Sequence, residues 1–306
     1  MTRGVSAFLA RRLVTAIVFV LLVSSSALVL TRLVPGDATT ESAFTPGGQA
    51  VRAQERARLG LDRPIAVQLG AWLAGLARFD LGTSSRFNKP VGDLLRQHAG
   101  PTAELATVAL GLALVIGVPI GVLTGARPRS LLARAITPIS LALVACPPLV
   151  GALVLLWLAL VTGRLSVEPG RLAVPALALA LPLGAMIERL QSQATGEALA
   201  SPDVVATAAR GVPPARLIWT HAARRSLRPV LGLFGIVIGT LFSGSLAVEW
   251  VTSWPGLGRL TYDAVVSRDV DLVAGCALAG AVLIALGNMF ADLARALVDP
   301  RVREQP

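Results

Sequence analysis

The segment Asp203–Val230 reads DVVATAARGVPPARLIWTHAARRSLRPV, and it decides how the rest of the chain is interpreted. It is a polar, arginine-rich island between long apolar segments, and two helical patterns flank a break at Gly211, Pro213 and Pro214. Arginine side chains are costly to place in lipid, so in a membrane protein this island must face water. An ordered helix–turn–helix on an aqueous face is a docking surface for a soluble partner.

The composition of the chain indicates a membrane protein. Its mean hydropathy is +0.68 and only 15% of its residues are charged, whereas soluble domains carry about 25%. A bilayer core needs about 20 helical residues, and lipid requires every backbone group to be paired, as in a helix. The fourth apolar run is short, and we extend it into Glu188 and Arg189 on the aqueous side. We therefore predict an all-α integral membrane fold with six transmembrane helices: Leu13–Leu30, Leu105–Ala126, Ala135–Gly163, Leu172–Ile187, Val230–Val248 and Leu272–Ala291.

The distribution of arginine predicts the orientation of these helices, because short cytoplasmic loops are enriched in Lys and Arg. With six helices, four arginine groups fall on one side of the membrane. Both termini and the Asp203–Val230 island are therefore expected in the cytoplasm. The predicted divisions are residues 1–34 (N-terminus and first helix), 35–100 (extracytoplasmic segment), 101–300 (five-helix core with a cytoplasmic coupling loop at 188–229) and 301–306 (cytoplasmic tail).

Three other interpretations of the sequence are less favoured. The net charge of +10 would suit a nucleic-acid partner, but the charges flank apolar runs rather than cluster on one face. The first apolar run, Leu13–Leu30, is longer than the core of a signal peptide and no A-x-A site follows it, which favours an uncleaved helix. The two cysteines, Cys146 and Cys276, are expected to be small buried side chains without a metal or disulfide role.

The chain lacks the motifs of a self-powered transporter or an enzyme. A Walker A loop needs Lys followed by Ser or Thr, but the only lysine is Lys89, which Pro90 follows. With only His98 and His221, no H-E-x-x-H zinc motif exists, and no G-x-S-x-G elbow occurs. We expect no cofactor or metal bound by this chain. Proton-driven carriers place ionisable residues inside their helices; here candidates occur only near helix ends, at Glu104, Glu188 and Glu249, so a secondary carrier is a remote alternative.

Two segments carry a family resemblance: the island, and VEWVTSWPGLGRL at Val248–Leu260. The island resembles the cytoplasmic "EAA" loop of ABC importer permeases. The second segment is similar to a signature of the first of the two permease subunits in their dipeptide/oligopeptide/nickel family. Dispersed motifs extend the resemblance over nearly the whole chain. One departure is that the Glu-Ala-Ala positions read Val205, Ala206 and Thr207, so no role of that glutamate carries over. The matching island residues are Gly211, His221, Ala222, Arg224, Leu227 and Pro229, and the dispersed motifs are at Ala10–Leu13, Pro35–Asp37, Leu59–Pro64, Asp80–Gly82, Pro101–Ala106, Leu179–Leu183 and Asp299–Arg301.

The resemblance implies a function and a set of partners. The chain would be a multi-pass permease of the bacterial plasma (inner) membrane, forming the translocation pathway with a sister permease. An extracytoplasmic substrate-binding protein would deliver the substrate, most simply a peptide, with nickel or another metal chelate as the alternative. Two cytoplasmic ATPase subunits would bind ATP and Mg and drive transport.

The resemblance also assigns the ATPase-coupling role to the island. A short helix is expected to start after Gly211, with proline in its first turn, where it is tolerated. Its apolar residues would enter a groove in the ATPase, and Arg216, Arg224 and Arg225 would pair with acidic residues around that groove. The alternative is a solvated loop at the lipid headgroups whose arginines only set topology. The predicted coupling residues are Gly211, Pro214, Arg216, Leu217, Ile218, Trp219 and Arg224.

Several outer segments carry weaker expectations. Pro64–Phe79 has the pattern of an amphipathic helix, and Trp254–Gly258 that of a re-entrant or surface turn. We expect structural roles for Asp37, at the end of the first helix, and for Glu249, which could pair with Arg259; substrate contacts are the alternative for both. The pathway-lining residues remain unassigned, because small residues at helix interfaces more often serve packing; the small residues in question are Gly239, Ser243, Gly244 and Ser245.

Overall fold

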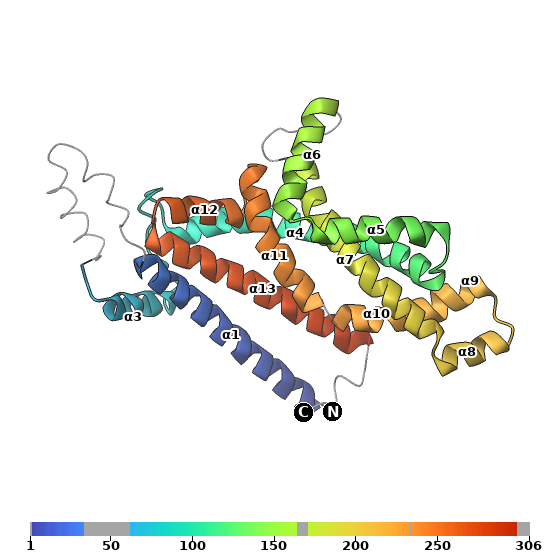
Figure 1. Ribbon diagram of the computed structural model, residues 1–306. Helices are drawn as coiled ribbons and strands as arrows, with labels where there is room; N and C mark the ends of the chain where they lie inside the picture. The colour runs from blue at the N-terminus through green and yellow to red at the C-terminus, as the bar shows by residue number, and fades with distance from the viewer. Residues whose placement is uncertain (1, 34–61, 164–170, 233, 299–306) are drawn as a thin grey trace. The chain divides into compact units, whose positions relative to one another are not determined.

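All regular structure in the described part of the chain is helical. The computed structural model describes residues 2–33, 62–163, 171–232 and 234–298, and within these ranges no strand occurs beyond an isolated bridge between Thr83 and Pro90 (Figure 1). The all-α prediction is confirmed. Asp37 lies outside the described residues.

Within the described residues, five helices are long and apolar enough to cross a membrane. A sixth candidate exists only if α5 (Leu131–Ala145) and α6 (Pro148–Thr162) together count as one span. The five helices are α1 (Thr2–Leu33), α4 (Val91–Ala126), α7 (Ala173–Leu199), α11 (Phe234–Val251) and α13 (Val270–Val298).

The run Ala135–Gly163, predicted as one spanning helix, is broken into α5 and α6, which meet at a bend of 108°. The cause is local. Cys146 adopts an extended backbone (ψ 117°) before Pro147, since proline disfavours the helical region in the residue that precedes it. Pro148 then occupies the first turn of α6, where proline is tolerated. An apolar run alone does not reveal this bend.

One compact unit comprises residues 1–10, 103–254 and 286–306. Helix α7 is central to it and packs against α5, α6 and α11. Its buried residues Leu179 and Ile187 belong to a core that also includes Val237 and Val248 of α11. Trp254 is buried in the same core, so of the two predictions for Trp254–Gly258, a re-entrant or a surface turn, the surface turn does not describe its first residue.

The second compact unit comprises residues 11–102 and 255–285. It contains α3 (Ile65–Leu76), which confirms the predicted amphipathic helix, and α12 (Leu257–Val266), which the sequence analysis missed. The Asp269 carboxylate orders the start of α13: it accepts hydrogen bonds from the Ser84 hydroxyl at 2.6 Å and from the Leu272 backbone N–H at 3.2 Å. Cys276 is buried in this unit's core, as expected, whereas Cys146 is only partly buried.

Candidate coupling site

The arginine-rich island folds into three short helical segments ahead of α10. Helix α8 (Pro202–Ala209) ends before Gly211, whose φ of +80° is the left-handed conformation that favours glycine. Pro213 is extended, and α9 (Pro214–Arg216) starts with Pro214 in its first turn. A π-helical segment, η2 (Leu217–Ala222), follows and runs into α10 (Ala223–Gly232). The helix start after Gly211 is as predicted, but the π-helical turn was not.

The predicted coupling residues occupy the outer side of this segment. Trp219 is 47% exposed, and Arg216 and Arg224 are also exposed. Leu217 and Ile218 are half-buried, so they contribute less free apolar surface than their sequence pattern indicates. A π-helical turn is rare and is frequent at functional sites, and here it carries the exposed tryptophan.

One arginine of the island is already paired within the chain. Arg225 of α10 forms a salt bridge with Asp203 of α8, so it is not available to a partner in the way the sequence analysis expected. The pKa of the Asp203 carboxyl lies below its usual value, because of hydrogen bonding with the Ser201 side chain and also because of the positive charge of Arg225. The pair joins the two arms of the island on either side of Gly211.

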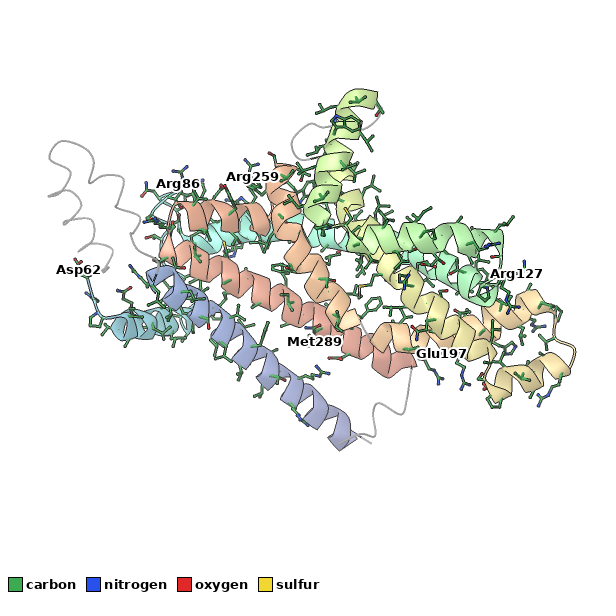
Figure 2. The ribbon with its side chains drawn as sticks, in the orientation of Figure 1. Asp62, Arg86, Arg127, Glu197, Arg259 and Met289 are labelled. Carbon is green, nitrogen blue, oxygen red and sulfur yellow. The ribbon has the colours of Figure 1, made fainter. Side chains whose placement is uncertain are left out.

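The inner side of α10 is anchored to α7 by buried polar side chains. Gln191 Nε2 donates to the Ser226 hydroxyl at 2.6 Å and to the Thr195 hydroxyl at 3.2 Å, and Thr195 is 3.2 Å from Ser226. All three residues are at most 1% exposed. The outer face of α7 differs, because Gln193 Nε2 donates to Glu197 Oε1 on the exposed surface. Glu197 points away from the helices (Figure 2).

One turn earlier on α7, Glu188 joins three helices. Its two carboxylate oxygens accept hydrogen bonds of 2.7 Å each, from Thr124 of α4 and from Ser140 of α5. Glu188 is only 5% exposed. The prediction that it lies on the aqueous side, at the start of the coupling loop, is therefore corrected: α7 continues to Leu199 and buries this carboxylate among hydroxyl groups.

Helix α4 approaches α7 closely along Gly117, Gly121 and Gly125. A Cβ atom on these glycines would lie 2.5 Å from the Gly184 carbonyl oxygen, 2.6 Å from that of Glu188 and 2.2 Å from that of Ser192. Such distances are shorter than real Cβ contacts, so only glycine fits. The α4–α7 contact therefore leaves no room for a side chain at these three positions.

The sequence analysis missed Gln191, Thr195 and Ser226, although a signal for part of the network exists. Glu188, Gln191 and Thr195 follow the spacing i, i+3, i+7, which places them on one helical face. Polar residues on one face of an otherwise apolar helix find buried partners in the folded protein.

The other residues considered in the sequence analysis, Glu249 and the small residues of α11, do not form one site with the coupling residues. Glu249 is fully buried in α11. Gly244 serves packing, because a Cβ there would lie 3.1 Å from Pro148 Cγ, whereas Gly239 has open space around it. Among the residues that the structure describes, no three His, Cys, Asp or Glu side chains gather in a cluster able to hold a metal ion.

Comparison with known protein families shows which family the chain belongs to. Residues 117–304, more than half of the chain, match the family described as binding-protein-dependent transport system inner membrane component. The chain belongs to this family. Residues 5–90 match the N-terminal component of the same transport systems. The protein is thus a multi-pass permease of the ABC importer class, as its apolar helices also indicate.

Relatives of the permease cover nearly its full length. It is 33% identical to a putative peptide permease protein of Brucella suis, over 90% of this chain and 92% of that protein. It is 32% identical to the oligopeptide transport system permease protein AppB of Bacillus subtilis and 32% identical to the di/tripeptide transport system permease protein DppB of Pseudomonas aeruginosa. Each of these two alignments covers 97% of this chain and 99% of the relative.

Proposed function

We propose that this permease imports peptides. The support comes from its relatives, which are named as permeases for peptides, oligopeptides and di- or tripeptides. Those names do not favour the alternative of nickel or a metal chelate. The permease would lie in the bacterial plasma membrane with both termini in the cytoplasm, an orientation that rests on the arginine distribution.

The proposed assembly supplies what this chain lacks. A sister permease would complete the pathway, and an extracytoplasmic binding protein would deliver the peptide. Because the sequence has no Walker A loop, two partner ATPase subunits would bind ATP and Mg and hydrolyse the nucleotide.

The coupling role rests on one observation: the segment that exposes Trp219 is anchored on its other side, through Ser226, to Gln191 of α7. An ATPase that holds Trp219 and the exposed Arg216 and Arg224 would pull on α10. The buried hydrogen bonds would pass this movement to α7, and the Glu188 carboxylate would pass it to α4 and α5. A partner can shift a two-state protein only through contacts that differ between its states, and these contacts are suited to that role.

Reconstitution tests the proposal. The permease, its sister and the two ATPases are placed in lipid vesicles, and uptake of a radiolabelled dipeptide is measured with the binding protein on the substrate side. We expect uptake that requires both ATP and the binding protein, and no ATP hydrolysis by the permease alone. Uptake of Ni²⁺ but not of dipeptide by the same vesicles would favour the metal-chelate alternative. Hydrolysis by the isolated chain, free of contaminants, would contradict the assigned division of labour.

A further inference from the structure

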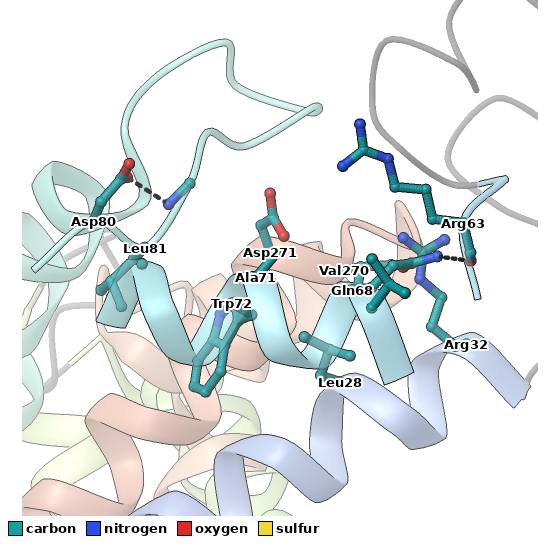
Figure 3. Close-up of a pocket in the computed structure, with 13 residues that line it drawn as sticks. Leu28, Arg32, Arg63, Gln68, Ala71, Trp72, Asp80, Leu81, Val270 and Asp271 are labelled. Carbon is teal, nitrogen blue, oxygen red and sulfur yellow. Dashed lines mark hydrogen bonds between the residues drawn. The ribbon is translucent and has the colours of Figure 1, made fainter. Parts of the chain in front are cut away.

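An open cavity of about 230 Å³ lies in the unit formed by residues 11–102 and 255–285 (Figure 3). It is distinct from the coupling site, which belongs to the other unit. Four parts of the chain line it: the end of α1, helix α3 with the residue before it, the turn at Asp80–Gly82, and the start of α13. The cavity is larger than the roughly 150 Å³ that holds benzene and smaller than the roughly 300 Å³ of the smallest drug-sized sites. A ligand of one or two amino-acid residues is the size that fits.

The floor of the cavity is apolar but contains one unused hydrogen-bond donor. Leu28 and Trp72 line it and pack against Ala274. Trp72 is only 7% exposed, and its indole Nε1–H has no hydrogen-bond partner among the residues that the structure describes. A buried tryptophan N–H usually finds a partner, so this donor is suited to an oxygen of a bound ligand.

The charged side chains around the cavity are separated by sign. Figure 3 shows Arg32 and Arg63 together at one end and Asp80 at the other, with Asp271 between them. The two arginines can bind a carboxylate, which is the geometry that guanidinium groups match best. The acidic end can bind an ammonium group.

The acidic side is held in place by close backbone packing. The Gly82 backbone N–H donates to Asp80 Oδ1 at 3.0 Å. Gly82 has a φ of +80°, and a Cβ atom on it would lie 2.6 Å from Asp271 Oδ2. The turn therefore holds Asp80 by a hydrogen bond and passes close to Asp271, and a preorganised site loses less entropy on binding.

We infer that this cavity binds a small zwitterion, a dipeptide or the free ends of a short peptide, on the extracytoplasmic side of the permease. The carboxylate would lie toward Arg32 and Arg63, a backbone carbonyl would accept from Trp72, and the ammonium group would lie toward Asp80 and Asp271. The inference rests on the proposed peptide substrate and membrane orientation. It adds a contact that the peptide makes with the permease itself, away from the coupling segment.

The test measures binding to the assembled transporter without its binding protein. Isothermal titration of the complex in nanodiscs uses alanyl-alanine, the same dipeptide with an acetylated N-terminus, and its C-terminal amide. Glycerophosphoethanolamine, the soluble headgroup of a zwitterionic lipid, is a fourth probe. We expect alanyl-alanine to bind and each blocked dipeptide to bind about tenfold to hundredfold more weakly, the loss typical of a charge-assisted contact.

Two variants assign the binding to this cavity. Trp72→Phe keeps the ring and removes only the N–H, and should weaken alanyl-alanine binding about three- to tenfold. Arg63→Gln should weaken binding of the free dipeptide but not of its amide. Arg78→Gln changes an exposed arginine just after α3 that does not line the cavity; it is the matched control and should bind like the unmodified permease.

Three outcomes would overturn the inference. The first is no binding of alanyl-alanine, and the second is that the Trp72→Phe and Arg63→Gln variants bind it as tightly as the unmodified permease does. The third is binding of glycerophosphoethanolamine alone, which would make the cavity a lipid-headgroup site. The proposed function is judged separately, by dipeptide uptake in the vesicles described above. Uptake without cavity binding would refute this inference alone, and loss of both would refute the proposed substrate.

Discussion

Gln191 of α7 donates a 2.6 Å hydrogen bond to the hydroxyl of Ser226 of α10, 35 residues further along the chain, and both side chains are buried. The bond ties the base of the exposed island to the helix at the centre of its unit. Because a polar group buried without its partner is costly, α10 cannot leave α7 without exposing Gln191 to water or leaving it unsatisfied. The island and α7 should therefore move together.

Removing the Ser226 hydroxyl should loosen this joint. In Ser226→Ala, Gln191 keeps only the longer bond to Thr195, and we expect the complex to lose about 1–3 kcal/mol of stability. The readout is the midpoint of thermal unfolding of the purified complex. Gln193→Ala is the matched control, because its bond to Glu197 lies on the exposed face of the same helix and should contribute only about 0.2–0.5 kcal/mol. Equal midpoints for both variants would show that the buried hydrogen bond contributes no more stability than the exposed one.

Loss of the hydrogen-bond donors to the buried Glu188 carboxylate should destabilise the permease more than loss of the donors and the carboxylate together. The double variant Thr124→Val/Ser140→Ala leaves the buried charge without the two hydroxyls that bind it, at a cost of about 3–5 kcal/mol. Adding Glu188→Leu should restore more than half of that loss, since an apolar side chain needs no donor. Thr107→Val, on the exposed side of α4, is the control. A triple variant less stable than the double would contradict this account.

The α4–α7 contact should reject even one methyl group at its tightest point. A Cβ on Gly125 would lie 2.2 Å from the Ser192 carbonyl oxygen, whereas a Cβ on Gly111 of the same helix would have no described atom within 4 Å apart from its own stretch of helix. Gly125→Ala should therefore destabilise the permease by about 1–3 kcal/mol. Gly111→Ala should be neutral or stabilising by about 0.5–1 kcal/mol, because alanine suits a helix better than glycine. The measurement is again thermal unfolding, and a similar effect of both substitutions would refute the close approach.

The helical architecture and the position of the island could be predicted from sequence because both depend on short-range rules. Apolar runs of bilayer length predict helices, and Gly211 with Pro213 and Pro214 predicts a break and a helix start, as the structure has it. The amphipathic α3 follows from the same periodicity.

Of the features that the sequence did not reveal, the burial of Glu188 depends on partners distant in the chain, whereas the bend between α5 and α6 and the π-helical turn are local. The Glu188 carboxylate was predicted to face water because it follows an apolar run, yet Thr124 and Ser140 lie 64 and 48 residues before it and bury it. The bend between α5 and α6 was missed because two prolines inside an apolar run did not change its hydropathy. The π-helical turn at Leu217–Ala222 was missed because six residues do not distinguish its period from that of an α-helix.

The proposed orientation can be tested by labelling single cysteines. In a background with Cys146→Ala and Cys276→Ala, Gly70→Cys and Ala215→Cys each place one thiol at an exposed position. A membrane-impermeant maleimide added to intact cells should label position 70 and leave position 215 unlabelled until the membrane is opened. Labelling of position 215 in intact cells would invert the topology and remove the basis for a cytoplasmic coupling site.

The exposed Trp219 should be required for coupling and not for assembly of the membrane unit. Buried aromatic anchors at interfaces contribute about 2 kcal/mol or more, and an aspartate would place a charge where the ATPase groove requires an apolar side chain. We expect Trp219→Asp to insert normally and to bind the substrate-loaded binding protein, but to transport at least about tenfold less peptide per ATP hydrolysed, since an ATPase that does not hold α10 cannot bias α7.

Two variants make this prediction specific to the segment. Trp219→Phe keeps an apolar ring at the same position and should retain most of the transport. Leu131→Asp places the same charge on an exposed residue at the start of α5, outside the island, and should transport near the unmodified level. The measurement is peptide uptake beside ATP hydrolysis in reconstituted vesicles. If Trp219→Asp transports as well as Trp219→Phe, the island is a solvated loop whose arginines set topology, and the joint between the ATPase and α7 lies elsewhere.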